Sequence, residues 1–244
     1  MFTLFKREVN YFFSSLIGYV VVSVFLVMMG LLLWVFSGQF NILDTGYANI
    51  DSLFIIAPWV FLFLIPAITM RVFAEEKRTG TIELLLTRPF GDFTIVFAKF
   101  LASLFIVFLA LLPTVIYFAT IYFLAVPQGN IDVAGITGSF IGLFFLAAVY
   151  VSIGIFASSL TENQIIAFII AVLISFFFYT GFDSLAMLNF LSPTSALIQS
   201  LGISAHYTSI SRGVIDSRDI IYFLSVIALF LFFTRLKLQS RKWK

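Results

Sequence analysis

The chain has 244 residues, of which 61% are hydrophobic and only 11% are charged, and its mean hydropathy is +1.11. This composition excludes an ordinary soluble domain and indicates an integral membrane protein. The lack of cysteine excludes disulfides, thiol nucleophiles and cysteine-bound metals. A single histidine argues against a histidine metal site, and a net charge of +2 gives no support to a nucleic-acid partner.

The first fifteen residues carry the pattern of a helix that lies along a membrane surface. Apolar side chains recur at helical spacing and polar ones fall on the other side (Phe2, Phe5, Val9, Phe12 and Phe13 against Lys6, Arg7, Asn10 and Ser14). The pattern predicts an interfacial helix over residues 1–15. The apolar run that follows is too long for a cleaved signal and lacks a small-residue cleavage site.

Six apolar segments follow, each near the roughly 20 residues that cross about 30 Å of hydrocarbon. They run approximately from Leu16 to Phe36, Leu53 to Val72, Thr94 to Leu124, Ile136 to Ser158, Ile165 to Phe182 and Ile220 to Leu238. We therefore predict an all-α protein with six transmembrane helices. Pro58 and Pro66 are expected to kink the second span and Pro113 the third. Lys99, near the start of the third span, is expected to reach the cytoplasmic headgroups as an anchor.

Basic residues fix the predicted orientation, because six spans place both termini on one side. Twelve of the fourteen lysines and arginines lie in the two terminal segments or around the loop after the second span, and only Arg212 and Arg218 lie opposite. The positive-inside rule then predicts that both termini and this loop are cytoplasmic.

The loop from Arg71 to Asp92 separates spans two and three and contains the most distinctive stretch of the chain. Thr79 is expected to cap a short helix, Gly80 permits an abrupt turn, and Pro89 ends the helix at Arg88. About two turns of helix are marginal in water alone. The helix therefore needs a surface to lie against: the bilayer, its own bundle or another protein.

The segment from Asp183 to Asp219, between spans five and six, is long and apolar for an external loop. Two short helices, Leu185 to Leu191 and Ala196 to Ile203, are predicted on either side of Ser192-Pro193-Thr194 and form a re-entrant hairpin. His206 follows them and is interpreted as a surface or interface residue.

The sequence has no GxxxxGK[ST], HExxH or GxSxG motif, so no catalytic residues are assigned and ATP is not bound in a phosphate loop of this chain. Glu75-Glu76 is similar to the glutamate pair of intramembrane prenyl-peptidase-like proteases. The arginine required four residues later is Gly80 here, however. No acidic residue lies at the centre of a span, which argues against an ion-driven carrier.

The run EEKRTGTIELLLTRP, from Glu75 to Pro89, resembles the signature of type-2 ABC transporter permeases, in which G-T-[IL]-E-x-L-L precedes a proline. The order of the elements over the whole chain fits the same family. The run from Ser211 to Leu224 and the chain length are similar to the gliding-motility-associated permease subunits of Bacteroidetes, the GldF type.

The resemblance implies that the loop helix is a coupling helix that docks on a separate cytoplasmic ATPase, which binds ATP and Mg. It implies that one set of residues contacts or positions that ATPase: Glu75, Glu76, Lys77, Arg78, Gly80, Thr81, Glu83 and Leu84. A helix with a charged rim and leucines is also suited to a helix-in-groove contact.

The resemblance further implies two permease subunits, identical or different, with a pathway between them along spans two and five. Candidate pathway residues are Pro58, Pro66, Ser175, Tyr179 and Thr180. The predicted function is an inner-membrane permease subunit of a bacterial ATP-driven exporter that works by alternating access. A non-transporting membrane scaffold that assembles with the same ATPase is the alternative. Stimulation of ATP hydrolysis by substrate in liposomes would favour transport.

Overall fold

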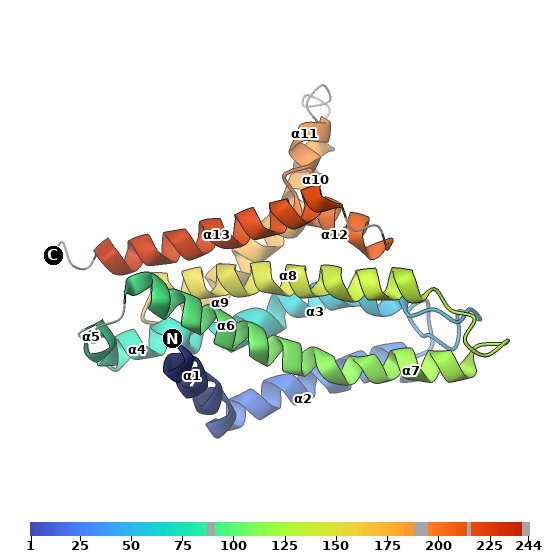
Figure 1. Ribbon diagram of the computed structural model, residues 1–244, viewed down its shortest axis with the longest axis horizontal. Coiled ribbons are helices and arrows are strands. Elements are labelled where there is room, and N and C mark those ends of the chain that lie inside the picture. The colour runs from blue at the N-terminus through green and yellow to red at the C-terminus, as the bar shows by residue number, and fades with distance from the viewer. Residues whose placement is uncertain (87–90, 188–194, 214–215, 241–244) are drawn as a thin grey trace.

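The computed structural model describes residues 1–86, 91–187, 195–213 and 216–240. Arg88, Pro89 and the Ser192-Pro193-Thr194 break lie outside the described residues. Within these ranges the chain is helical and contains no strand (Figure 1). The helices are α1 (Phe2–Ser14), α2 (Leu16–Gly30), α3 (Asp51–Thr69), α4 (Arg71–Arg78), α5 (Thr81–Leu86), α6 (Asp92–Leu111), α7 (Val115–Leu124), α8 (Val133–Leu160), α9 (Gln164–Phe176), α10 (Phe182–Ala186), α11 (Ser195–Gln199), α12 (Ile203–Ser211) and α13 (Ser217–Gln239).

Six helical segments among the described residues are long and apolar enough to cross a membrane, which confirms the predicted number of spans. They are Gly18–Val35, Asp51–Arg78, Asp92–Leu124, Val133–Leu160, Gln164–Ala186 and Ser217–Gln239. A 3₁₀ turn at Leu112–Thr114 separates α6 from α7, so the irregularity predicted at Pro113 is present. In contrast, α3 runs as one α-helix through Pro58 and Pro66.

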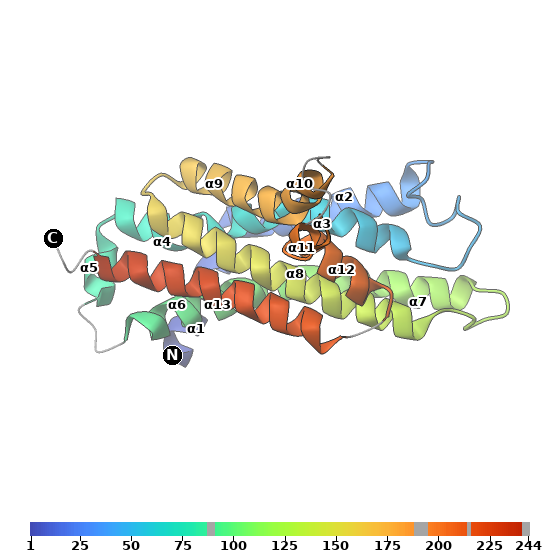
Figure 2. The ribbon, with the colours of Figure 1, turned by 90° about the horizontal axis from the view of Figure 1, so that it is seen from above.

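The long helix α8 is the centre of the bundle, with α3, α6, α9 and α13 packed around it (Figure 2). Small residues permit this packing. A Cβ atom on Gly154 would lie only 2.0 Å from Thr69 Oγ1, so α3 and α8 approach closely at this point. Tyr150, also on α8, is fully buried. The contact between the second and fourth spans is therefore part of the core of the protein.

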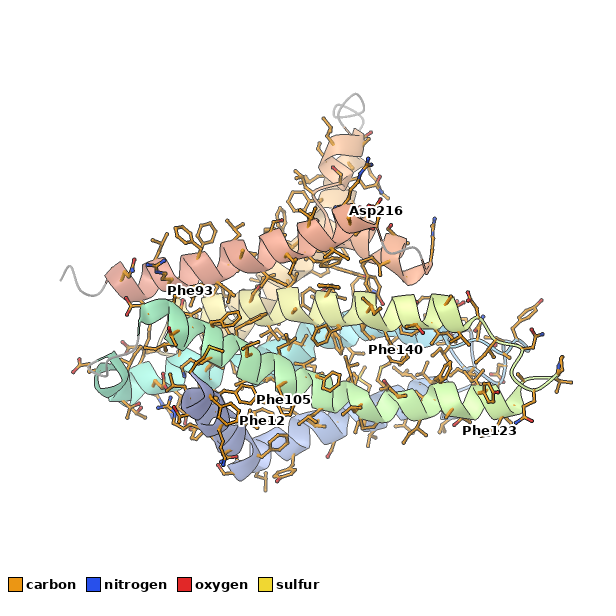
Figure 3. The ribbon with its side chains drawn as sticks, in the orientation of Figure 1. Phe12, Phe93, Phe105, Phe123, Phe140 and Asp216 are labelled. Atoms are coloured by element: carbon orange, nitrogen blue, oxygen red, sulfur yellow. The ribbon has the colours of Figure 1, made fainter. Side chains whose placement is uncertain are left out.

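The outer surface of the bundle is apolar, as a lipid-facing surface requires. Phe105 and Phe123, on α6 and α7, project outward and are 37% and 70% exposed (Figure 3). Exposed aliphatic side chains also line much of α2 and α9. These faces explain why the chain is so rich in phenylalanine and aliphatic residues.

The helix predicted at the N-terminus is present as α1, which lies against α6 at an angle to the bundle rather than along it (Figure 1). Its buried apolar residue is Leu4, and Phe5 packs edge-on against Phe105 at 5.6 Å between ring centroids. Phe2, expected on the apolar side, is 75% exposed.

The segment between spans five and six leaves the bundle sideways, and α10 and α11 project from it before α12 packs back on α8 and α13 (Figure 1). The predicted second helix, Ala196 to Ile203, is wrong in its end point. Helix α11 ends at Gln199 and α12 begins at Ile203. Gly202, which precedes α12, has an extended backbone conformation.

Candidate coupling site

The turn between α4 and α5 lies at one end of the bundle, the end at which α13 also finishes (Figure 2). Gly80 has φ +72°, a left-handed conformation that residues with a Cβ avoid, and this reverses the chain after α4. Thr79 Oγ1 donates to the carbonyl of Glu75 at 2.9 Å. The predicted N-cap role of Thr79 is therefore wrong, because its hydroxyl caps the end of α4 rather than the start of α5.

The inward side of α4 is attached to α8 through serines. Ser158 Oγ accepts from the backbone N–H groups of Phe73 and Ala74 at 2.9 and 3.0 Å, and donates to the carbonyl of Met70 at 2.9 Å. The N–H groups in the first turn of a helix have no partner within that helix. Ser158 of α8 supplies the acceptor and thus caps the N-terminus of α4. Lys77 is buried and donates to the carbonyl of Ser159.

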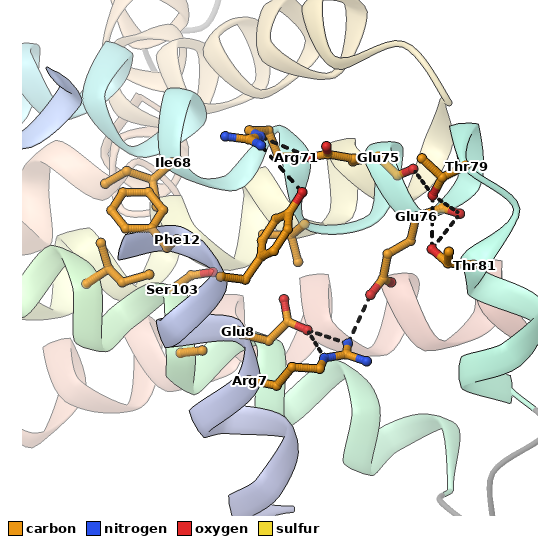
Figure 4. A pocket seen from close by; sticks show the side chains of 14 residues that line it. Arg7, Glu8, Phe12, Ile68, Arg71, Glu75, Glu76, Thr79, Thr81 and Ser103 are labelled. Atoms are coloured by element: carbon orange, nitrogen blue, oxygen red, sulfur yellow. Dashed lines mark hydrogen bonds and ion pairs between the residues drawn. The ribbon is translucent and has the colours of Figure 1, made fainter. Parts of the chain in front are cut away.

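An ion-pair network joins α4 to α1 and α6, and Figure 4 draws its members Arg7, Glu8 and Glu76. Lys99 Nζ lies 2.9 Å from Glu76 Oε1, 3.2 Å from Glu8 Oε1 and 2.9 Å from the carbonyl of Val72. Arg7 bridges the same two carboxylates, at 2.5 Å to Glu8 and 3.1 Å to Glu76. The predicted anchoring role of Lys99 is wrong, because its side chain is 2% exposed and points into this network. A cation with two carboxylates inside the protein has no reason to reach the headgroups.

A second pair on the same face connects α4 to α1. Arg71 Nε lies 2.9 Å from Glu75 Oε2, and its guanidinium lies 5.6 Å from the centre of the Tyr11 ring. A cavity of about 370 Å³ is lined by this pair and by Arg7, Glu8 and Glu76, with Phe12 and Ser103 also on its walls (Figure 4). Burial alone would raise the pKa of Glu8, but the Lys99 charge and the Arg7 hydrogen bond lower it below its ordinary value.

The residues predicted to contact or position the ATPase divide into two groups. Glu75, Glu76 and Lys77 point inward and bind other parts of the chain. Arg78, Gly80, Thr81 and Glu83 are exposed at the end of the bundle. The side chain of Leu84 lies outside the described residues.

The candidate pathway residues do not form one surface. Pro58 and Pro66 are buried in α3, and Ser175 is buried on α9. Tyr179 and Thr180 lie in the π-helical turn Phe177–Gly181. Such turns are frequent at functional sites. Of these five, only Tyr179 lines the cavity of about 630 Å³ at the other end of the bundle.

That cavity has an aromatic and charged lining from several parts of the chain. Trp59 and Ile55 come from α3, Tyr207 and Arg212 from the region of α12, and Asp132 from the start of α8. Trp59 and Tyr179 meet edge-on at 5.6 Å between ring centroids.

Sequence reasoning missed three residues that organise these sites. Ser158 appeared as an ordinary small residue at the end of a span, although its hydroxyl caps a neighbouring helix, and the backbone carbonyl of Ser159 accepts from Lys77. Tyr150 is fully buried beside Tyr179, and its hydroxyl has no partner among the described residues. No local pattern distinguishes such a tyrosine from a lipid-facing one.

The fold and the site define a polytopic, all-helical membrane protein whose second and third spans are joined by a short helical turn fixed to the bundle. The sequence profile of the ABC-2 family transporter proteins matches residues 34–235, most of the chain, and the chain belongs to this family. Members of the family are membrane subunits that generally work with an ATPase subunit. A search among curated proteins finds no match.

Proposed function

We propose that this chain is the permease subunit of an ATP-driven ABC exporter of the gliding-motility type in the bacterial inner membrane. ATP and Mg are bound and hydrolysed on a cytoplasmic ATPase subunit. The exposed turn formed by Arg78, Gly80, Thr81 and Glu83, together with Leu84, docks on that subunit. Glu75, Glu76 and Lys77 position the turn from the inside.

One observation carries this proposal: α4 is fixed to the bundle on its inward side and is followed directly by an exposed turn. Ser158 and the Lys99 network attach α4 to α8, α6 and α1, and the exposed turn follows directly. A force applied to the turn is therefore delivered to three elements of the bundle at once. Packed elements of this kind move as rigid bodies, which is how closure of two ATPases would reorient the spans.

The distribution of charge supports a cytoplasmic position for this end of the bundle. Helix α1, which carries Lys6 and Arg7, and the C-terminal end of α13, which carries Arg235 and Lys237, lie at the same end of the bundle as α5 (Figure 1). An excess of lysine and arginine is typical of the cytoplasmic side.

The pathway is proposed to follow one face of α3 beside α9. Ile55, Trp59 and Phe63 form an exposed stripe at i, i+4 spacing on an otherwise buried helix. Trp59 also contacts Tyr179 across the cavity at the opposite end. A second permease subunit, identical or different, would close this face.

Affinity purification of the tagged chain from native membranes tests the docking surface. The variant carries Glu83→Arg and Gly80→Pro, since proline cannot adopt φ +72°. Glu162→Arg, an exposed charge reversal in the connection between α8 and α9, is the matched control. We expect a soluble protein with a phosphate-loop motif to accompany the wild type and the control and to be lost from the variant.

Thermal unfolding of each purified chain establishes that the variant is folded. The proposed docking surface would be refuted if the folded variant retains the ATPase, or if the Glu162→Arg control loses the ATPase as the variant does. Any second membrane protein that co-purifies identifies the partner permease.

A further inference from the structure

The only histidine of the chain makes two hydrogen bonds where α12 meets the start of α13. His206 Nδ1 lies 2.6 Å from Asp219 Oδ1, and His206 Nε2 lies 2.8 Å from the backbone carbonyl oxygen of Ser200. The imidazole stacks on the Tyr222 ring at 3.9 Å between centroids, and the Tyr222 hydroxyl donates to the carbonyl of Leu201 at 2.6 Å. His206 and Tyr222 therefore hold the same short connection between α11 and α12.

The partners of the ring determine how many protons it shares with Asp219. A backbone carbonyl only accepts, so Nε2 must carry a proton. The contact between Nδ1 and the carboxylate needs a second proton, on either the ring or Asp219. With one proton fewer, either two acceptors face each other at 2.6 Å or the bond to Ser200 is lost.

Burial makes this proton count matter. Asp219 is 6% exposed, and within the described residues its carboxylate is bonded to His206 alone, with Oδ2 unpartnered. A buried carboxylate without a compensating charge is strongly unfavourable. The doubly protonated pair satisfies this requirement and the singly protonated pair does not.

The elements packed around α12 supply few other groups that titrate. From α13 the ring faces Asp219 and Tyr222, and α8 presents Ser139 and glycines to α12. The π-helical turn contributes Tyr179, which is buried. Asp183 of α10 lies beside Gly202 and accepts a hydrogen bond from Ser204. Arg212, Asp216 and Arg218 lie at the exposed end of α12 and the start of α13.

From this geometry we infer that His206 and Asp219 form a proton-dependent clamp, which fastens the α11–α12 connection to α13 when the pair holds two protons and releases it when one is lost. The clamp is a property of this chain alone. It rests on the proposed function only for its location, which is the side of the membrane opposite the ATPase. There it would make the projecting α10–α12 segment respond to external pH.

Two measurements on one sample test the clamp. The chain is purified without a polyhistidine tag, so that ¹⁵N-histidine labelling reports on His206 alone. NMR then follows protonation of both ring nitrogens from about pH 5 to about pH 8, the range in which histidine changes charge. Hydrogen exchange of residues 200–211, corrected for the intrinsic dependence on pH, follows release of the connection.

We expect exchange protection to fall at least about tenfold as the ring loses its proton, which is the loss of one charge-assisted hydrogen bond. Asp219→Asn and His206→Gln should abolish the dependence on pH. Tyr222→Phe should lower protection at every pH but keep the dependence, because it removes only the hydroxyl bond. Unchanged exchange in α8 establishes that each variant is folded.

The clamp is refuted if protection of residues 200–211 does not follow the titration of His206, or if His206→Gln retains the wild-type dependence on pH. Neither measurement involves the ATPase. Failure of the clamp is thus distinct from failure of the coupling-site proposal.

Discussion

Ser158→Ala should weaken the attachment of α4 to α8, because a single hydroxyl joins three backbone groups at this joint. The substitution leaves the N–H of Phe73 without an acceptor in a buried position and removes the bond to the Met70 carbonyl. An unpaired buried donor costs about 1–3 kcal/mol and a lost cap about 1 kcal/mol. We expect the free energy of unfolding to fall by about 2–3 kcal/mol, which corresponds to a fall in Tm of roughly 5–10 °C.

Ser152→Ala is the matched control. Ser152 is equally buried on the same helix, but its hydroxyl donates only to the carbonyl of Val149 in its own helix, at 2.7 Å. Its loss should cost less than about 1 kcal/mol. Thermal unfolding of both variants in the same detergent, followed by tryptophan fluorescence, measures the difference. Equal Tm values for the two variants would show that Ser158 does not cap α4.

Three further predictions concern the same helix contacts. Lys99→Met should lower the free energy of unfolding by about 1–3 kcal/mol, since it leaves the exposed Arg7 as the cation that Glu8 and Glu76 share; thermal unfolding no different from the wild type would contradict the buried ion pairs of Lys99. Because the native pKa of Glu8 is lowered, its contribution to stability is complete above its ordinary value of 4.5 and is lost as pH falls through the native pKa. Unfolding of wild type and Glu8→Gln should therefore converge in acid, and a constant difference down to about pH 3 would contradict the shift. Gly154→Ala should destabilise the protein by about 1–3 kcal/mol through contact with Thr69, with partial rescue by Thr69→Ala; a neutral Gly154→Ala in thermal unfolding would mean that α3 and α8 are farther apart than described.

The spans were predictable because membrane insertion acts on each segment separately. An apolar run of about 20 residues is recognisable without its neighbours, and the six spans agree with their predicted centres. Helix ends within the segment after span five were less predictable. Gly202 ends the connection in extended backbone, and the helix Ile203–Ser211 depends on packing against α8 rather than on local sequence.

The sequence predicted a short helix in the loop after span two, and α4 and α5 lie there, but it did not predict the direction of the side chains. Glu75, Glu76 and Lys77 form a run of charges that is usually solvated, and two of the three bind residues distant in sequence, Glu76 to Lys99 and Lys77 to Ser159. Lys99 was assigned to the headgroups because it lies near the start of the third span, and its acidic partner on α1, Glu8, is far away in the sequence. A pairing across such a distance follows from tertiary structure alone.

Two of the attachments of α4, Ser158 and the Lys99 network, differ in chemistry, and the difference bears on how α4 transmits force. Ser158 holds the backbone of α4 with directional hydrogen bonds that a shift of 1 Å would break, so α4 and α8 must move as one body. The Lys99 network is electrostatic, and its strength falls only gradually with distance. It therefore tolerates small sliding of α1 and α6 past α4 without losing the pairing. A push on the exposed turn would thus rotate α4 and α8 together, while α1 and α6 follow through a compliant contact.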